Sequence, residues 1–185
     1  GWDGTGRALG EALRDAKVAD SVTFENKGGA AGAIGLAQFY NAAKGDPYRI
    51  DTLLIFMANM AWNSTMNTSE VRKMLNDKAE DGEYKIPFLV VCDAFHSEMT
   101  AFADLLLPDT TYLERHDCMS MLDRPISEFD GPVDSVRIPV LPPTGQCKPF
   151  QEVLVELAGR LGLPAFVHAD GTRKYRDYPD FIVNY

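Results

Sequence analysis

The sequence has little cysteine, few basic residues and no long apolar run, and each shortage excludes a class of protein. Its three cysteines, Cys92, Cys118 and Cys147, lie too far apart for a CxxC motif or a disulfide framework. The 18 Lys and Arg against 27 Asp and Glu give a formal net charge of -9, which does not favour nucleic-acid binding. The longest apolar stretch, from Leu53 to Met60, is well short of the roughly 20 residues that a membrane span needs. We therefore expect a soluble chain that neither binds nucleic acid nor spans a membrane.

The composition that remains is that of a folded α/β protein. Hydrophobic residues make up 45% of the 185 residues and charged residues 24%, which is enough to bury one sizeable core. In the front segment, residues 9–16 have helical spacing and residues 21–25 alternate as in a strand. A second helix runs to Ala43, where Gly45 and Pro47 are typical of a helix end.

Beyond Pro47 the pattern changes to short, continuously apolar runs separated by polar segments. These runs predict strands near residues 51–57, 87–92 and 103–107, and continuous apolarity is typical of parallel strands covered on both faces. Asn67 with Glu70 three residues later resembles a capping box and predicts a short helix through Leu75. The fold class is therefore α/β with a mainly parallel sheet and flanking helices. Cys92 ends one apolar run, so we expect it in the core.

The last third of the chain is less regular. Residues 109–149 have little periodicity and are rich in proline, which predicts a long irregular segment. A helix is predicted at residues 150–161, with Leu154, Leu157 and Leu161 on its apolar face and Gly162 after its end. Residues 173–185 give no assignment.

Polar side chains follow two of the predicted strands. Asn59 and Asn63 come after the first, and Asp93 and Ser97 after the second. In an open parallel sheet the carboxyl ends of the strands form the crevice that binds ligands. An Asp at this position can accept two hydrogen bonds from a purine edge or a ribose. The alternative is that Asp93 and Asn59 only cap neighbouring helices.

These strand-end residues belong to stretches that resemble a known family. The stretches Tyr48–Leu53, Ala58–Asn63 and especially Val90–Pro108 resemble the catalytic subunits of the molybdopterin (bis-MGD) oxidoreductases. The later order of Pro143–Gly145 and Phe150–Pro164 is similar as well. The resemblance covers residues 47–185, about three quarters of the chain.

The resemblance implies a Rossmann-like half-domain that holds the guanosine end of molybdopterin guanine dinucleotide as a partial site. Its implied contacts are Asn59, Asn63, Asp93 and Ser97. The molybdenum ligand, the iron-sulfur cysteines and the second cofactor-binding domain of such enzymes lie outside the matched stretches, so no catalytic residue and no metal ligand is predicted here. Because the cofactor carries the redox chemistry, we expect no activity from the chain alone. Its implied partners are the remainder of the molybdoenzyme catalytic subunit, together with an iron-sulfur electron-transfer subunit, in a bacterial cytoplasm or periplasm.

One stretch departs from the pattern of that family. Residues Glu114–Ser120 stand where these enzymes commonly have Gly-Thr and Glu-Gly-Arg sequences. The departure favours a particular branch, and we expect one that acts on sulfur oxyanions. His96 and His116 have no paired carboxylate or nucleophile, so we predict ordinary polar contacts for both.

Residues 1–46 resemble a different family. The stretches Gly1–Arg7 and Phe24–Gly35 are similar to substrate-binding proteins of tripartite tricarboxylate transporters, in which helix N-termini bind a carboxylate. The implied anion ligands are Asp3, Thr5, Gly29 and Ala31; the alternative is that the glycines only allow close packing. We expect a chimera joined near residues 45–48. A carboxylate-binding module and a non-functional junction product are the alternative functions.

Overall fold

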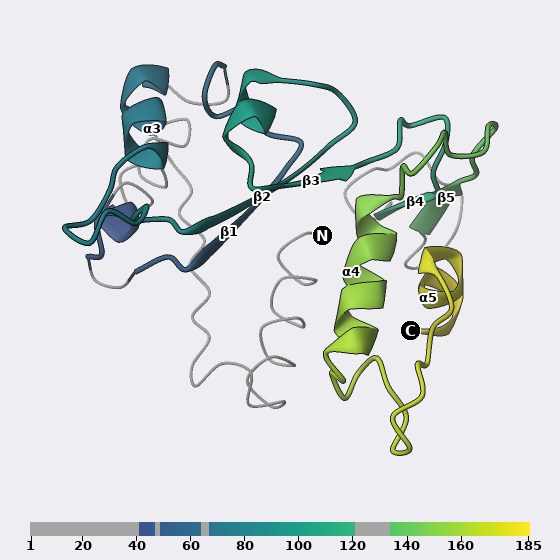
Figure 1. Cartoon of the computed structure of the whole chain (residues 1–185). Helices are drawn as coiled ribbons and strands as arrows, with labels where there is room; N and C mark the ends of the chain where they lie inside the picture. Colours follow the sequence, from purple (N-terminus) through teal and green to yellow (C-terminus); the bar gives the residue numbers. More distant parts are fainter. Residues whose placement is uncertain (1–40, 47–48, 64–66, 121–133) are drawn as a thin grey trace. The chain divides into compact units, whose positions relative to one another are not determined.

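The computed structural model forms two compact units. Among the described residues, one unit contains those from 41 to Asp109 and the other contains those from Thr110 to Tyr185, and each is described separately below. The predicted helix at 9–16 and strand at 21–25 lie outside the described residues. The structure describes residues 41–46, 49–63, 67–120 and 134–185 (Figure 1).

A three-stranded parallel sheet is the centre of the first unit. Its strands β1 (Thr52–Phe56), β2 (Phe88–Asp93) and β3 (Leu105–Pro108) are ordered β1-β2-β3. Leu54 pairs with Val90, which pairs with Leu105. The predicted strands at 51–57, 87–92 and 103–107, and their parallel pairing, are confirmed. The strand order does not reverse within the described residues, so the Rossmann-like arrangement stays a prediction.

Helical segments connect the strands. The helix α3 (Thr68–Leu75) follows β1 and precedes β2 in the sequence. Its N-cap Asn67 accepts a hydrogen bond from the Glu70 backbone at 3.2 Å. The predicted helix start is therefore confirmed, although the Glu70 carboxylate accepts from Lys73 at 2.6 Å. Between β2 and β3 lies a short 3-10 helix, η2 (Glu98–Phe102).

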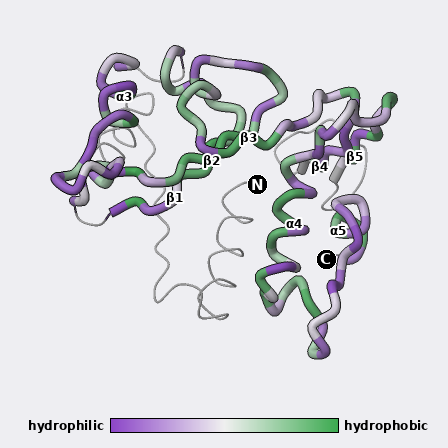
Figure 2. Tube along the Cα trace, viewed as in Figure 1, coloured by the Kyte–Doolittle hydropathy of each residue, from purple (hydrophilic) through white to green (hydrophobic). Residues whose placement is uncertain are grey.

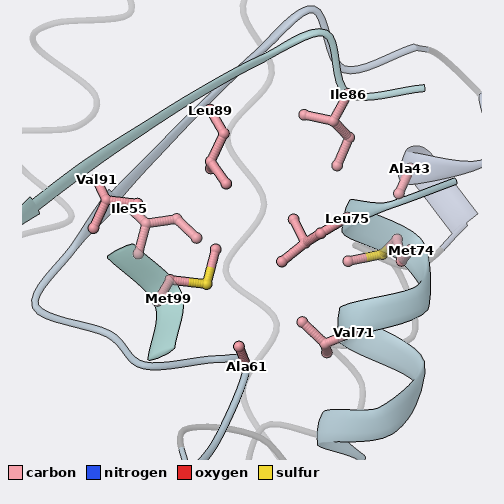
Figure 3. Close-up of a cluster of buried hydrophobic side chains, with 10 residues drawn as sticks. All are labelled: Ala43, Ile55, Ala61, Val71, Met74, Leu75, Ile86, Leu89, Val91 and Met99. Atoms are coloured by element: carbon pink, nitrogen blue, oxygen red, sulfur yellow. The ribbon is translucent and has the colours of Figure 1, made fainter. Parts of the chain in front are cut away.

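One hydrophobic core lies between these helical segments and the sheet. Figure 3 shows side chains of α3 turned toward those of the strands, with Met99 of η2 in the same cluster. Full burial of one Val, Leu, Ile or Met side chain stabilises a fold by about 1.5–3 kcal/mol. Cys92 is fully buried, which confirms its predicted core position. The cluster consists of Ala43, Ile55, Ala61, Val71, Met74, Leu75, Ile86, Leu89, Val91 and Met99.

Two hydrogen bonds fix the start of β3 to β2. At the amino end of β3, Asp104 accepts a hydrogen bond from the Leu89 backbone at 2.8 Å, and its own N–H donates to the Leu89 carbonyl at 2.9 Å.

The outer face of the sheet is apolar and partly exposed. Figure 2 shows hydrophobic colour along β2 and β3. On the face of the sheet opposite α3, Leu54, Phe88 and Leu105 keep about two fifths of their surface exposed, at 42%, 41% and 43%.

The helix that ends the predicted front segment is described only at its last turn. Residues 41–43 are helical, and Gly45 adopts a φ of 88°, a left-handed conformation that glycine adopts readily at a helix end. The predicted helix stop is therefore confirmed at this point.

The second unit contains a pair of strands that was not predicted. The strands β4 (Asp117–Ser120) and β5 (Asp134–Arg137) pair antiparallel, with Cys118 opposite Val136. The prediction of an irregular segment throughout residues 109–149 is therefore wrong. Strands of four residues are too short to show a readable alternation, and their partners lie far apart in the sequence.

An ion-pair network with one buried member, Arg115, holds these strands to the following helix, α4 (Phe150–Arg160). The Asp117 carboxylate accepts hydrogen bonds from Arg115 at 3.2 Å, from Arg137, and from Gln151 of α4 at 2.8 Å. The Arg115 side chain is only 4% exposed and also donates to the Thr110 carbonyl at 3.2 Å. A buried guanidinium of this kind depends on its carboxylate partner.

The predicted helix at 150–161 is confirmed by α4, but its predicted apolar face is wrong. Leu157 and Leu161 are 44% and 40% exposed. The buried face is instead that of Phe150, Val155 and Ala158. Apolar residues occur on more than one side of α4, so the sequence is compatible with more than one buried face. Only the packing against the rest of the unit selects one.

Charged groups near the start and end of α4 form a second network. Glu156 accepts hydrogen bonds from Lys148 at 2.5 Å and from Arg160 at 2.7 Å. These bonds, first to Lys148 and then to Arg160, lower the pKa of Glu156 to about 2.

The last residues form a helix for which no assignment was predicted, α5 (Tyr178–Asn184). Its N-cap Asp177 accepts from the Asp180 backbone at 2.8 Å, and Pro179 lies in the first turn. Phe181 of this helix stacks on Phe166 with a centroid distance of 5.7 Å. None of the helices in the described part of the chain combines the length and apolar character that a membrane span requires.

Candidate functional site

The carboxyl ends of the three parallel strands lie at one edge of the sheet. The backbone pairing continues past the strands, because Met57 N–H donates to the Cys92 carbonyl and Asp109 N–H donates to the Asp93 carbonyl, both at 3.0 Å. The residues that directly follow β1, β2 and β3 are therefore held side by side. We refer to residues 57–63 and 93–98 at this edge as the carboxyl edge.

A strained turn positions Asn59 at the end of β1. Met57 has a φ of 49°, in the left-handed region that non-glycine residues rarely adopt. The chain then forms a turn in which Trp62 and Asn63 donate their backbone N–H groups to the Asn59 carbonyl at 3.2 and 3.0 Å. Backbone strain of this kind occurs at binding sites more often than elsewhere.

A hydrogen bond joins the first strand end to the second. The Asn59 side chain donates from Nδ2 to Oε2 of Glu98 at 2.5 Å. This bond is the first cause of the lowered pKa of the Glu98 carboxyl, which stays ionised near neutral pH. Because an ionised carboxylate only accepts, the amide nitrogen of Asn59 must face it and the amide oxygen must face away.

Two buried polar atoms at the carboxyl edge have no hydrogen-bond partner among the described residues. They are Oδ1 of Asn59 and Oγ of Ser97. A buried polar atom without a partner destabilises a fold by about 1–3 kcal/mol, so such atoms are few and each needs a physical reason. A bound polar ligand is one such reason.

The segment after β2 is shaped by its own side chains. Asp93 accepts the Phe95 backbone N–H through Oδ1 at 3.1 Å, a turn that starts directly at the strand end. Thr100 donates its hydroxyl to the Ser97 carbonyl at 2.6 Å and lies 3.0 Å from Nδ1 of His96. The ordinary polar contact predicted for His96 is therefore confirmed.

The chemistry of the carboxyl edge is that of an acceptor. Residues 57–63 and 93–98 contain neither Lys nor Arg. They present the carboxylate of Asp93, the amide oxygen of Asn59 and the hydroxyl of Ser97, while the carboxylate of Glu98 is bonded to Asn59. The edge lacks the cationic partners that a phosphate usually has, although Trp62, Asn63, His96 and Ser97 carry side-chain donors. A ligand with N–H and O–H groups can donate to the Asp93 carboxylate and to the Asn59 oxygen.

All four predicted cofactor contacts lie at this edge. Asn59, Asp93 and Ser97 directly adjoin the strand ends, and Asn63 follows one turn after Asn59 with an exposed side chain. The alternative that Asn59 and Asp93 cap helices is wrong, because their side chains bond to Glu98 and to the Phe95 backbone instead.

Other predicted residues lie elsewhere, and one contact was missed. Asp3, Thr5, Gly29 and Ala31 lie outside the described residues. The contact of Glu98 with Asn59 was not predicted, although Glu98 follows Ser97 directly in the resembling stretch. Within the described residues, no three His, Cys, Asp or Glu side chains gather as a group able to hold a metal ion.

Comparison with known proteins decides the family. A family model described as molybdopterin oxidoreductase matches residues 11–160. The chain belongs to the molybdopterin oxidoreductase family. The match includes most of the front segment, and the comparisons do not show its resemblance to tricarboxylate-binding proteins. The domain boundary between residues 46 and 47 stays a prediction.

Three curated relatives in this family match the chain over part of their length. A sulfite dehydrogenase subunit from Allochromatium vinosum is 81% identical over 145 residues, 78% of this chain and 15% of that protein. The thiosulfate reductase molybdopterin-containing subunit from Salmonella typhimurium is 37% identical over 81 residues, 43% of this chain and 10% of that protein. Nitrate reductase from Symbiobacterium thermophilum is 32% identical over 114 residues, 62% of this chain and 13% of that protein. The chain thus spans about a seventh or less of the length of these relatives.

Membership of the molybdopterin oxidoreductase family implies a molybdopterin cofactor. The carboxyl edge fits the polar parts of such a group, because two of its buried polar atoms have no partner among the described residues. The comparisons give no support to a carboxylate-binding module or to a junction product.

Proposed function

We propose that this chain holds the guanosine end of molybdopterin guanine dinucleotide in an oxidoreductase. In this proposal residues 47–185 carry the site, and the sheet is the centre of a Rossmann-like half-domain. The observation that carries the proposal is the pair of unpartnered buried atoms, Oδ1 of Asn59 and Oγ of Ser97, at one edge of a parallel sheet.

The acceptor character of the edge favours the base and ribose over the diphosphate. The Watson–Crick edge of guanine carries adjacent N–H donors, and a ribose carries hydroxyl donors. A carboxylate such as that of Asp93 can accept two parallel N–H groups, and such charge-assisted bonds are about twice as strong as neutral ones. Asn59 and Ser97 supply further partners, and Asn63 is the fourth contact that we propose.

The bound cofactor would supply the redox chemistry, and the residues of this chain would bind and orient it. We therefore propose no activity for the chain alone. The partners that we propose are the remainder of the catalytic subunit, together with an iron-sulfur electron-transfer subunit.

Calorimetric titration with uncharged guanosine tests the cofactor site. We expect guanosine and guanosine diphosphate to bind with similar affinity, and adenosine to bind more weakly because its edge lacks the paired donors. Asp93→Asn should weaken guanosine binding by about tenfold or more, since a hydrogen bond to a charged group contributes about 1.5–3 kcal/mol.

The matched control is Asp51→Asn, which removes the same charge at the amino end of β1, at the opposite edge of the sheet. This variant should bind guanosine as the unaltered chain does. Equal binding of guanosine and adenosine, or an unchanged affinity of the Asp93→Asn variant, would contradict the proposal.

For the whole enzyme we propose a sulfur oxyanion as substrate. Two of the relatives are named for sulfite and thiosulfate, and one of them is 81% identical over 145 residues. The departure at Glu114–Ser120 supports the same branch. The enzyme that contains this sequence should be purified and assayed with sulfite and an electron acceptor, and with thiosulfate or nitrate and an electron donor. Turnover of nitrate without turnover of either sulfur compound would refute this assignment.

A further inference from the structure

The Asn59 amide can present either of two opposite groups to a ligand. Its oxygen accepts a hydrogen bond and its nitrogen donates one, and the two ends of the amide have nearly the same shape. Which of them faces the ligand therefore depends on what holds the other end. In this structure the holder is Glu98, 39 residues further along the chain.

The carboxylate of Glu98 permits only one orientation of that amide. The hydrogen bond from Nδ2 to Oε2 is 2.5 Å long, and an ionised carboxylate has no proton to donate. With Nδ2 fixed on Glu98, the oxygen Oδ1 is left buried and without a partner among the described residues. A single rotation about the end of the Asn59 side chain would exchange the two groups, and the charge on Glu98 prevents it.

We propose that Glu98 is a positioning residue that sets the specificity of the carboxyl edge, by making Asn59 an acceptor for an N–H group of the bound ligand. The inference rests on the proposed function, because it assigns the polarity of one contact in the same site. Glu98 acts through Asn59 and contributes selectivity without contacting the ligand.

The charge-reversing variant Glu98→Lys tests the polarity directly. A lysine at this position only donates, so Asn59 would turn its oxygen toward the lysine and present Nδ2 to the ligand. Two donors would then face each other, and we expect guanosine affinity to fall by about tenfold or more. Guanosine is the suitable probe because it carries no charge that the new lysine would attract.

The double variant Asn59→Asp with Glu98→Lys restores the acceptor. One carboxylate oxygen of the new aspartate would pair with the lysine, and the other would face the ligand as Oδ1 does now. We expect guanosine affinity to return to within about threefold of the unaltered chain, which is a non-additive response of two contacting residues. A residue with only a structural role would not show this recovery.

The control for the charge change is Glu80→Lys, in the exposed loop between α3 and β2. It should leave guanosine affinity unchanged. Unaltered affinity in the Glu98→Lys variant would overturn the inference, and so would a double variant as weak as the single one. Absence of guanosine binding to the unaltered chain would instead refute the proposed function, so the two failures are distinguishable.

Thermal unfolding of each variant shows whether it is folded. Should the Glu98→Lys chain fail to fold, Glu98→Gln decides the question, because glutamine can hold either end of the Asn59 amide. If the two orientations are then equally populated, the binding-competent fraction halves and guanosine affinity falls about twofold. Adenosine would gain relative to guanosine. An unchanged ratio of the two affinities would overturn the inference.

Discussion

Removing the hydroxyl of Ser97 should change stability and ligand affinity in opposite directions. Its oxygen is buried without a partner among the described residues, so the folded chain carries the desolvation penalty of this group. That penalty is about 1–3 kcal/mol. Ser97→Ala keeps the Cβ and removes the oxygen, so we expect the free energy of unfolding of the ligand-free chain to rise by about 1 kcal/mol.

The same variant should bind guanosine less tightly. A neutral hydrogen bond contributes about 0.5–1.5 kcal/mol, which corresponds to a twofold to tenfold loss of affinity. Urea unfolding followed by circular dichroism gives the stability, with the slope on urea compared between variants, and calorimetry gives the affinity. Ser69→Ala, on the exposed surface of α3, is the matched control and should change neither quantity by much.

A loss of more than about 1 kcal/mol of stability in the ligand-free Ser97→Ala chain would contradict this prediction. Ser97 is the N-cap of η2, and such a loss is typical of an N-cap whose hydroxyl is bonded. It would show that the hydroxyl has a partner before any ligand binds.

Three further predictions concern the stability of each unit. Asp104→Ala should lower the free energy of unfolding by about 1.5–3 kcal/mol, because the Leu89 backbone N–H loses its charged acceptor; urea unfolding would measure it, and a loss below about 0.5 kcal/mol would contradict it. Asp117→Asn should lower the free energy of unfolding by about 1.5–3 kcal/mol, because the carboxylate charge that pairs with the buried Arg115 is removed, and an unchanged thermal midpoint would refute this. Glu156→Gln should cost about 0.5–1 kcal/mol at neutral pH. Because the folded pKa of Glu156 lies at about 2, below its usual value of 4.5, this contribution is present above that usual value and lost as pH falls toward 2; a difference between the two chains that persists at the lowest pH would argue against it.

The sheet was predictable from the sequence because its strands are continuously apolar. Runs such as Phe88–Asp93 are buried on the core side and need no knowledge of their partners. The polar residues that follow such runs lie at one edge by the geometry of parallel strands, which is why Asn59, Asp93 and Ser97 could be selected. Their roles as cofactor contacts stay predictions.

The remaining features depend on contacts between distant residues. The bond of Asn59 to Glu98 and the pairing of β4 with β5 join residues that no local pattern connects. The buried face of α4 was mispredicted because Leu157 and Leu161 compete with Val155 and Ala158 for the core. The start of α5 could have been predicted, since Asp177 followed by a proline and an acidic residue is a typical helix beginning.

The outer strand β3 gives the sheet room to grow. Within the described residues β3 pairs with β2 alone, and its outer backbone edge can pair with another extended segment. A further parallel strand beside β3 would end next to Asp109, in line with Asp93. Each added strand would place one more loop along the same row, so the length of ligand that this row can hold would increase by about 4.8 Å for every strand gained.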